Sequence, residues 1–284
     1  MRITGSDSRG RLYAFLAACS WSTAGVLQQQ LHCDIATQLA YRSLFAFISL
    51  AILVLARGES RRDLRNSLRP AALVVTALTA VTSGCFIAAL NETAAADVLF
   101  LFASGPIFVA LLAARFLDQR LTWSTLIAAA LALAGVVVMI GSPTGGAVLG
   151  DALSLVAVVT FAVVIVICGK HSEISMLPAV CLAQLLVLAV TLPFAHPTQP
   201  DLSQLGWLVL FGAGQLSLGE AFFVAAARRA TAAEVATISL LEIVLGPVWV
   251  WLNGTQSPTV ATVLGGVLVL LGVVVQMRAK VRRT

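Results

Sequence analysis

Three charged side chains lie well inside apolar stretches of the sequence, where charge is costly. They are Arg42, Glu220 and Glu242. An ionisable group in such a place has to face a partner, a ligand or a wet cavity, so it is a functional candidate by default. A carboxyl group there can bind a cation or carry a proton, and an arginine can hold an anion such as a carboxylate.

Each of these side chains also has a structural interpretation. Arg42 could form a fixed ion pair with Asp34 or Asp97. A buried glutamate could cap a neighbouring helix or bind a polar neighbour. Glu242 in particular could serve the backbone that Pro247 distorts five residues later, because a proline frees a carbonyl group one turn earlier. Both interpretations remain open at this stage.

Further polar and aromatic residues in the apolar stretches are weaker candidates for lining a binding site. They are Gln28, Gln184, Trp21, Phe86, Phe102 and Trp249. Trp249 follows Glu242 by seven residues and therefore shares its helical face. Pro106 and Pro247 are candidate hinges, although kinks fixed by packing are the simpler explanation for them.

The elements that must position these residues are membrane-spanning helices. Of the 284 residues, 59% are hydrophobic and 11% are charged, whereas a soluble domain is about half apolar and about a quarter charged. A membrane-spanning helix needs roughly 20 mostly apolar residues. Ten runs meet this requirement, at 12–31, 34–56, 70–90, 93–116, 121–141, 148–169, 175–195, 204–227, 230–252 and 258–278. The first run lacks the cleavage site of a signal peptide, and no period-two alternation indicates barrel strands.

The basic residues predict how these spans are oriented. All 18 Lys and Arg residues except Arg42 fall at the termini, in the connections or at the span ends that share one side of a ten-span protein. Because Lys and Arg are retained on the cytoplasmic side, we expect both termini in the cytoplasm. The net charge of +5 therefore reflects topology and not nucleic-acid binding. The arginine-rich stretch 57–69 would contact anionic lipids.

No motif for metal binding, cofactor binding or hydrolysis is found. The five cysteines show no CxxC spacing, and we interpret them as small apolar packing residues. Walker, HExxH and GxSxG motifs are absent, so ATP-driven pumping and hydrolysis have no support. We expect neither an enzyme nor a cofactor or metal site.

The second half of the chain resembles the first. At an offset of 137 residues, positions 95–98 align with 232–235, and the acidic residues Asp97 and Glu234 then coincide. An acidic group near a helix start is favoured by the exposed backbone amides, so we expect a structural role for this pair. Because a five-span repeat crosses the membrane an odd number of times, its second copy must be inverted. Inverted repeats around a midplane site are typical of transporters.

Four segments carry a resemblance to a known family. They are AYRSLFAFISLAIL (40–53), ETAAADVLFLFASGPIFVALLAARFL (92–117), LALAGVVVMIG (131–141) and RRATAAEVATISLLEIVLGPVWVWL (228–252). In their order and duplication they resemble the drug/metabolite transporter superfamily, in particular its EamA-like ten-helix bacterial members. Many members carry a Gly-Glu pair after spans four and nine, where this chain has Asp118-Gln119 and Gly254-Thr255.

The resemblance implies an all-α integral membrane protein with inverted five-helix repeats at 1–142 and 143–284. It implies a secondary transporter that exports small metabolites, such as neutral or apolar amino acids, across the inner (plasma) membrane by alternating access. The expected partners are a small-molecule substrate, membrane lipids and protons as the candidate coupling ion, with facilitated diffusion as the alternative to coupling. Two other functions remain open: a sugar-phosphate or nucleotide-type exchanger, which would need several cations in its cavity, and a non-transporting membrane assembly subunit.

Overall fold

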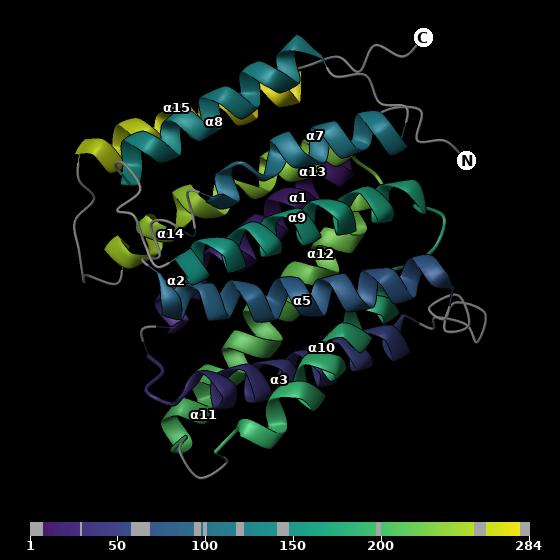
Figure 1. Ribbon diagram of the computed structural model, residues 1–284, viewed down its shortest axis with the longest axis vertical. Coiled ribbons are helices and arrows are strands. Elements are labelled where there is room, and N and C mark those ends of the chain that lie inside the picture. The colour runs from purple at the N-terminus through teal and green to yellow at the C-terminus, as the bar shows by residue number, and fades with distance from the viewer. Residues whose placement is uncertain are drawn as a thin grey trace.

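The computed structural model describes residues 8–28, 30–57, 69–93, 98, 101–117, 122–140, 148–196, 200–252 and 260–278. These residues are helical apart from short turns and connections, and none of them lies in a strand. The helices run alongside one another across the molecule and form one bundle (Figure 1). This confirms the predicted all-α fold.

The first half of the chain supplies six of the labelled helices. They are α1 (Ser8–Ser22), α2 (Ala24–Gln28), α3 (Ile35–Ala56), α5 (Pro70–Glu92), α7 (Gly105–Phe116) and α8 (Trp123–Ile140). The second half follows the same plan. Its elements are α9 (Val148–Lys170), α10 (Leu177–Thr191), η1 (Leu192–Phe194), α11 (Leu202–Val209), η2 (Leu210–Ser217), α12 (Leu218–Ala227), α13 (Ala232–Ser239), α14 (Leu241–Leu252) and α15 (Val260–Arg278).

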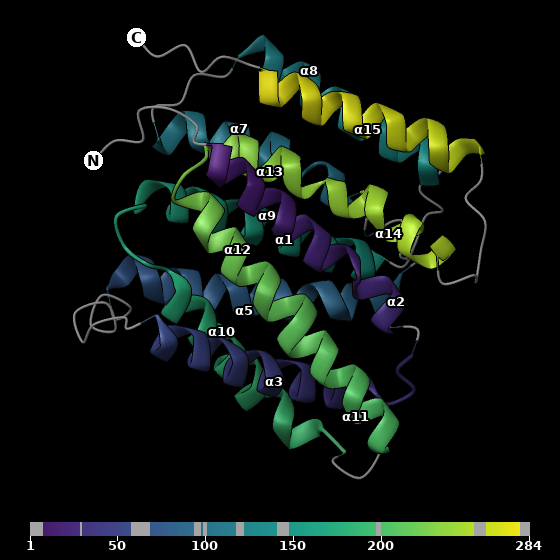
Figure 2. The same cartoon turned by 180° about the vertical axis from the view of Figure 1, so that it is seen from behind.

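Successive spans run in opposite directions across the bundle (Figure 2). α1 begins and α15 ends at the same end, where α3 and α9 also end. Every basic residue that the structure describes, apart from Arg42, lies at or near this end in the sequence of its helix. We call it the basic end, defined by Arg57, Lys170 and Arg278.

Five helical stretches are long and apolar enough, by length and composition, to cross a membrane. They are Ile35–Ala56, Pro70–Ala89, Val148–Lys170, Leu177–Phe194 and Leu202–Ala227. Three shorter apolar helices lie at Leu101–Phe116, Trp123–Val138 and Val263–Gln276. Two further predicted spans, the first and the ninth, are each divided into two pieces, α1 with α2 and α13 with α14.

The breaks in spans four and nine fall at corresponding points of the two halves. The first lies at Ser104, just before Pro106, whose ring lacks the N–H group that would continue the helix. The second lies at Leu240, between α13 and α14. Pro247 lies inside α14, seven residues beyond that break. The candidate hinge at Pro106 thus coincides with a break, whereas the one at Pro247 does not.

Helices of the two halves pair with one another throughout the bundle. The most extensive contacts join α8 with α15, α5 with α9, α3 with α10, and α1 with α12, and α7 also packs on α13. Spans two, four and five therefore contact their own repeat counterparts seven, nine and ten. Span one contacts span eight, and span three contacts span six. Because six is the repeat counterpart of one and eight is that of three, a pseudo-two-fold axis that interchanges the two halves also interchanges these two contacts.

Two glycines show how closely α8 and α15 approach. A Cβ atom on Gly135 would lie 2.5 Å from the carbonyl oxygen of Gly265, and one on Gly272 would lie 2.7 Å from that of Ala128. Gly135 and Gly272 coincide at the repeat offset of 137. Small residues at helix interfaces let backbones approach in membranes, so the duplicated glycine accounts for this reciprocal contact.

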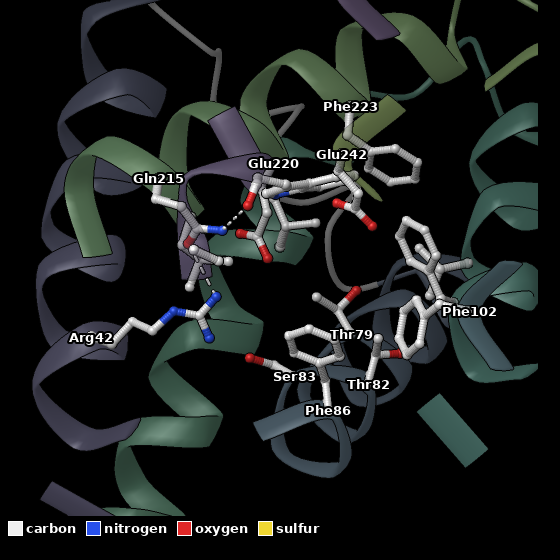
Figure 3. A pocket seen from close by; sticks show the side chains of 16 residues that line it. Arg42, Thr79, Thr82, Ser83, Phe86, Phe102, Gln215, Glu220, Phe223 and Glu242 are labelled. Carbon is white, nitrogen blue, oxygen red and sulfur yellow. Dashed lines mark hydrogen bonds between the residues drawn. The ribbon is translucent and has the colours of Figure 1, made fainter. Parts of the chain in front are cut away.

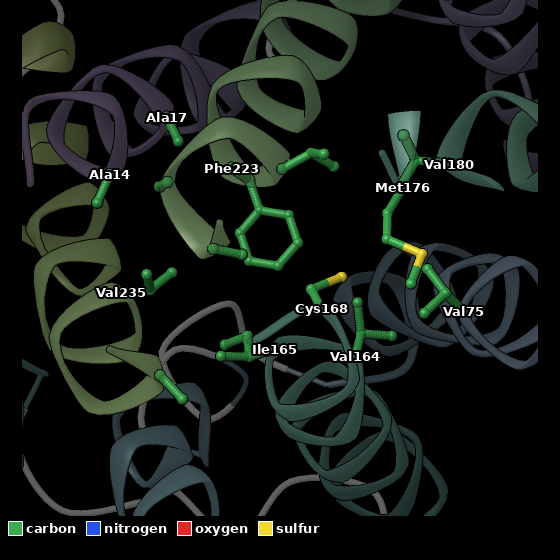
Figure 4. Close-up of a cluster of buried hydrophobic side chains, with 14 of the residues drawn as sticks. Ala14, Ala17, Val75, Val164, Ile165, Cys168, Met176, Val180, Phe223 and Val235 are labelled. Atoms are coloured by element: carbon green, nitrogen blue, oxygen red, sulfur yellow. The ribbon is translucent and has the colours of Figure 1, made fainter. Parts of the chain in front are cut away.

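The largest core cluster lies where α1, α9, α10, α12 and α13 meet (Figure 4). Phe223 occupies its centre, with Ile165 and Cys168 of α9 on one side and Met176 nearby. All five cysteines are free thiols, and Cys168 is 1% exposed, in agreement with a packing role. This cluster supports one wall of a cavity between the two halves, because Phe223 and Val164 belong to both.

Candidate functional site

A cavity with a volume of about 130 Å³ lies inside the bundle, between the two halves of the chain. Its walls come from α1, α2, α3, α5 and Phe102 of the first half and from α9, α10, η2, α12 and α14 of the second. For comparison, an apolar cavity of roughly 150 Å³ can hold benzene. The space is therefore sufficient for a compact small molecule or for several waters.

Arg42 projects from α3 into this cavity (Figure 3). Its Nη2 donates a hydrogen bond to Oε1 of Gln215 at 3.3 Å, and its guanidinium lies 4.6 Å from the centre of the Phe211 ring. The Nε atom has no hydrogen-bond partner among the described residues. The residue is 5% exposed, so a buried cation here is held by an amide and a ring and keeps one donor unused.

The ion pair of Arg42 with Asp34, which the sequence left open, is not formed. Asp34 instead caps the start of α3, where its side chain accepts hydrogen bonds from the backbone N–H and the hydroxyl of Thr37. Burial acts to raise the pKa of Asp34, but the hydrogen bonds from Thr37, together with smaller contributions from His196 and the backbone of Ala36, hold this pKa below its usual value. The other expected partner, Asp97, lies outside the described residues.

A π-helical turn places the partner of Arg42. Residues 210–217 form η2, a π-helix within the long helix that runs from α11 to α12. The Nε2 atom of Gln215 donates to the backbone oxygen of Trp21 at 3.2 Å, which turns its Oε1 toward Arg42. Because a π-turn shifts the side chains that follow it relative to an α-helix, it sets the direction in which Gln215 points.

Glu220 faces the same cavity from α12 and is 5% exposed. Its Oε1 accepts a hydrogen bond of 2.7 Å from Nε2 of Gln184 in α10. Its Oε2 has no partner among the described residues, and the same is true of Oε1 of Gln184. Glu220 and Arg42 point into one cavity from different sides without forming a direct salt bridge (Figure 3).

Glu242 completes the charged groups of the cavity. It lies in the first turn of α14, just after the break at Leu240. It also lines a smaller neighbouring cavity of about 20 Å³, which Pro106 of α7 and Ser239 of α13 help to form. No hydrogen bond or ion pair joins its carboxyl group to another described residue.

Hydroxyl groups of α5 form a third polar wall, which reasoning from the sequence missed. Thr79, Thr82 and Ser83 line the cavity. The hydroxyls of Thr79 and Ser83 have no partner among the described residues, whereas that of Thr82 pairs with Thr160 at 2.8 Å. Their spacing of three and four residues places them on one face of a helix, and this signal was present in the sequence.

Aromatic rings form much of the remaining wall of the cavity. Trp21, Phe161 and Phe223 contact one another, with ring centres 5.4 to 5.8 Å apart. Phe86 and Phe102 form an edge-to-face pair at 5.0 Å. All five line the cavity. Trp21, Phe86 and Phe102 were predicted candidates, and Phe161 and Phe223 are additions from the second half.

Three predicted candidates lie near the cavity without lining it. Gln184 donates a hydrogen bond to Glu220 but does not itself line the cavity. Nε2 of Gln28 donates to Oε1 of Gln38 at 2.6 Å. Nε1 of Trp249 donates to the hydroxyl of Ser22 at 2.8 Å. The latter two bonds link helices of the site region and so position the walls, and Oε1 of Gln28 is left without a partner among the described residues.

Glu234, at the basic end, takes the structural role expected for it. Its Oε2 accepts hydrogen bonds from the backbone N–H and the hydroxyl of Thr231, which forms a capping box at the start of α13. Its Oε1 accepts two hydrogen bonds from Arg11 of α1, at 2.8 and 3.0 Å. Glu234 is 1% exposed. This ion pair ties the first span to the ninth, and we call it the α1–α13 latch.

The cavity thus combines a cation, two carboxyl groups, free hydroxyls and aromatic walls. None of the described residues that line it is a His, Cys, Lys or Tyr, and no group of His, Cys, Asp or Glu suited to a metal ion occurs in the described part of the chain. The arrangement is suited to binding a small polar molecule with an apolar part.

Comparison with known proteins adds a family and a fold. The model of the EamA-like transporter family matches residues 8–141 and, a second time, residues 148–278. A comparison with curated proteins finds no match. A solved structure described as "Crystal structure of protein" is similar, with a TM-score of 0.82 and 21% sequence identity. The similarity covers 95% of this chain and 97% of that one, and it concerns the fold alone.

Proposed function

We propose that this chain, which belongs to the EamA-like transporter family, is a secondary carrier for small zwitterionic metabolites such as neutral amino acids. Membership makes it a multi-pass membrane transporter with a small-molecule substrate. The more specific parts of the proposal are the substrate, export across the inner (plasma) membrane, and alternating access at the cavity between the halves.

The observation that carries this proposal is a set of buried polar atoms without protein partners. Arg42 Nε, Glu220 Oε2, Thr79 Oγ1 and Ser83 Oγ all belong to residues that line the cavity. A buried polar atom that lacks a hydrogen bond costs about 1–3 kcal/mol, and more if it is charged. Native proteins leave few such atoms without reason, so a polar ligand or water is expected to complete them.

An amino acid matches this set in both charge and position. Its carboxylate fits the free donor of Arg42, and its ammonium group fits the free acceptors of Glu220 and the α5 hydroxyls. Its side chain would then lie among the aromatic rings, represented by Phe86 and Phe102 on one side and Phe161 on the other. The small volume of the cavity favours compact side chains.

Alternating access requires the bundle to open at one end and then at the other. The broken spans four and nine, which border the cavity at Phe102 and Glu242, are suited to such movement because their helices are already interrupted. We take the basic end as cytoplasmic, as the distribution of Lys and Arg favours. Export then means loading from the basic end and release at the opposite end.

The alternative functions fit the cavity less well. A sugar-phosphate or nucleotide exchanger has to compensate a multiply charged anion, yet Arg42 is the one basic residue among the described lining residues and two carboxyl groups oppose it. An assembly subunit has no need of a cavity with unpaired charged groups. Both alternatives remain as outcomes of the test.

Counterflow in proteoliposomes tests the proposal. Vesicles loaded with one unlabelled compound are diluted into its labelled form, and the panel contains neutral, acidic and basic amino acids, a sugar phosphate and a nucleotide. We expect exchange of small neutral amino acids, reduced at least about tenfold in Arg42→Gln, which is the loss of roughly 1.4 kcal/mol of binding free energy. Arg228→Gln, at the basic end and outside the cavity, is the matched control. Exchange of the phosphates alone, or of no compound, would contradict the proposal.

A further inference from the structure

The cavity holds an uneven set of charges. Among its described lining residues, Arg42 supplies one positive charge, and Glu220 and Glu242 supply two carboxyl groups. The remaining described walls from α1, α5, α9 and α10 present aromatic, aliphatic and hydroxyl side chains. Charge in such surroundings is costly unless an opposite charge compensates it.

The two carboxyl groups differ in their support. Glu220 receives a hydrogen bond from Gln184 and faces Arg42 across the cavity, and these are the two neighbours that stabilise a carboxylate. Glu242 has no hydrogen-bond or ion-pair partner among the described residues. Its surroundings in the second cavity are Phe102, Pro106, Ile165 and other largely apolar groups.

The charge balance of the closed, empty cavity determines whether the carboxyl group of Glu242 is protonated. Arg42 and Glu220 compensate each other, so an ionised Glu242, which is half-buried, would add a charge without a counterion to the cavity. The closed, empty cavity is therefore neutral when Glu242 holds a proton.

From this balance we propose a charge rule for transport: a substrate with one net positive charge is exchanged for one proton at Glu242, whereas a neutral zwitterion is exchanged without net proton movement. The rule rests on the proposed carrier function and adds which substrates are coupled to protons. A zwitterion brings one charge of each sign, so Glu242 keeps its proton while it is bound. A monocation replaces the charge of that proton, so Glu242 has to ionise.

The exchange step is a simple proton transfer. The O–H bond of the Glu242 carboxyl group breaks, and its proton passes through water to the solution on the side to which the cavity is open. The carboxylate that remains compensates the positive charge of the substrate. On the return of the empty carrier, a proton from the other side binds to Glu242, so each transported monocation moves one proton in the opposite direction.

Calorimetric titration of the full chain in detergent tests the rule. The probes are L-valine, a neutral zwitterion, and L-valinamide, which has nearly the same shape but one net positive charge at mildly acidic pH. Binding heats measured in buffers of different ionisation enthalpy give the number of protons released per ligand. We expect close to one proton for valinamide and close to none for valine.

Substitution of Glu242 should affect the binding of the two ligands differently. Glu242→Gln fixes a neutral group at this position, so valine binding should stay within about twofold, whereas valinamide binding should weaken more than about tenfold and release no proton. Glu242→Asp should keep the proton release, and it preserves the test if the glutamine variant fails to fold. Glu173→Gln, which removes an exposed carboxylate outside the cavity, is the matched control.

The outcomes are distinct from those of the counterflow test. Equal proton release with both probes, no binding of valinamide where valine binds, or unchanged valinamide binding in Glu242→Gln would overturn the charge rule while leaving the carrier intact. Binding of neither probe, together with no amino-acid counterflow, would instead overturn the proposed function and the rule that rests on it.

Discussion

At the scale of single residues, the site is notable for charges that do not pair with each other. Arg42 is held by the amide of Gln215 and the ring of Phe211, and Glu220 by the amide of Gln184. An amide can form a hydrogen bond with one atom of a charged group without neutralising the charge of that group. Because a direct salt bridge would cancel the charges that a zwitterion needs, amide partners keep the cavity able to bind one.

A substitution that neutralises Arg42 in place should therefore prevent binding without unfolding the protein. Gln215→Glu puts a carboxylate where the amide oxygen now accepts from Arg42, and a direct ion pair results. We expect amino-acid counterflow to fall at least about tenfold, with the thermal unfolding temperature unchanged or raised. Gln204→Glu makes the same change at the start of α11, outside the cavity, and should leave exchange intact. Full exchange by Gln215→Glu would contradict a substrate contact with Arg42.

At the scale of elements, interruptions of regular helices position the site. The break at Leu240 brings Glu242 into the first turn of α14, and the π-turn of η2 aims Gln215 at Arg42. By contrast, α8 and α15 are continuous and pack closely along their length. They lie together at one edge of the bundle (Figure 1), and neither contributes a described residue to the cavity. The bundle thus combines a regular, tightly packed pair with irregular helices around the cavity.

The contact between α8 and α15 yields a prediction about stability. Gly135→Ala would place a methyl group against the backbone of α15, and Gly272→Ala would do the same against α8. Such overpacking costs roughly 1–3 kcal/mol, so the unfolding temperature in detergent should fall in each variant. Gly84→Ala is the matched control, since nothing lies within 4 Å of its added Cβ and alanine is the better helix former by about 1 kcal/mol. Equal stability of all three variants would show that the two helices do not depend on this contact.

At the scale of the whole molecule, much of the architecture followed from composition and spacing. The apolar runs predicted the helices, and the charge within them singled out Arg42, Glu220 and Glu242, which share one cavity because burial of charge leaves few other places for it. The hydroxyls of Thr79 and Ser83 escaped notice because a hydroxyl can bond to its own helix and is tolerated in lipid. The pairing of Gln215 with Arg42 was not predictable, because a π-turn breaks the periodicity on which such reasoning depends.

The orientation of the molecule is open to direct measurement. In a variant that lacks the five native cysteines, a single cysteine is introduced at Glu173, at the basic end, or at Ser203, near the start of α11 at the opposite end. In intact cells, a membrane-impermeant maleimide should label the cysteine at position 203 and not the one at 173, with both labelled after lysis. The reverse pattern would mean that the distribution of basic residues does not set the orientation.

The two oxygens of Glu234 have a consequence for how the molecule moves. One oxygen binds Arg11 and the other serves the capping box with Thr231, so α1 can leave while the start of α13 stays capped. Separation loses charge-assisted hydrogen bonds worth about 1.5–3 kcal/mol, a factor of roughly 10 to 100 in population. We therefore expect the form in which this pair is intact to be the more populated one, with the separated form still accessible during a transport cycle. We propose that α1 moves as one intact helix when this pair separates, since the capping of α13 does not depend on Arg11.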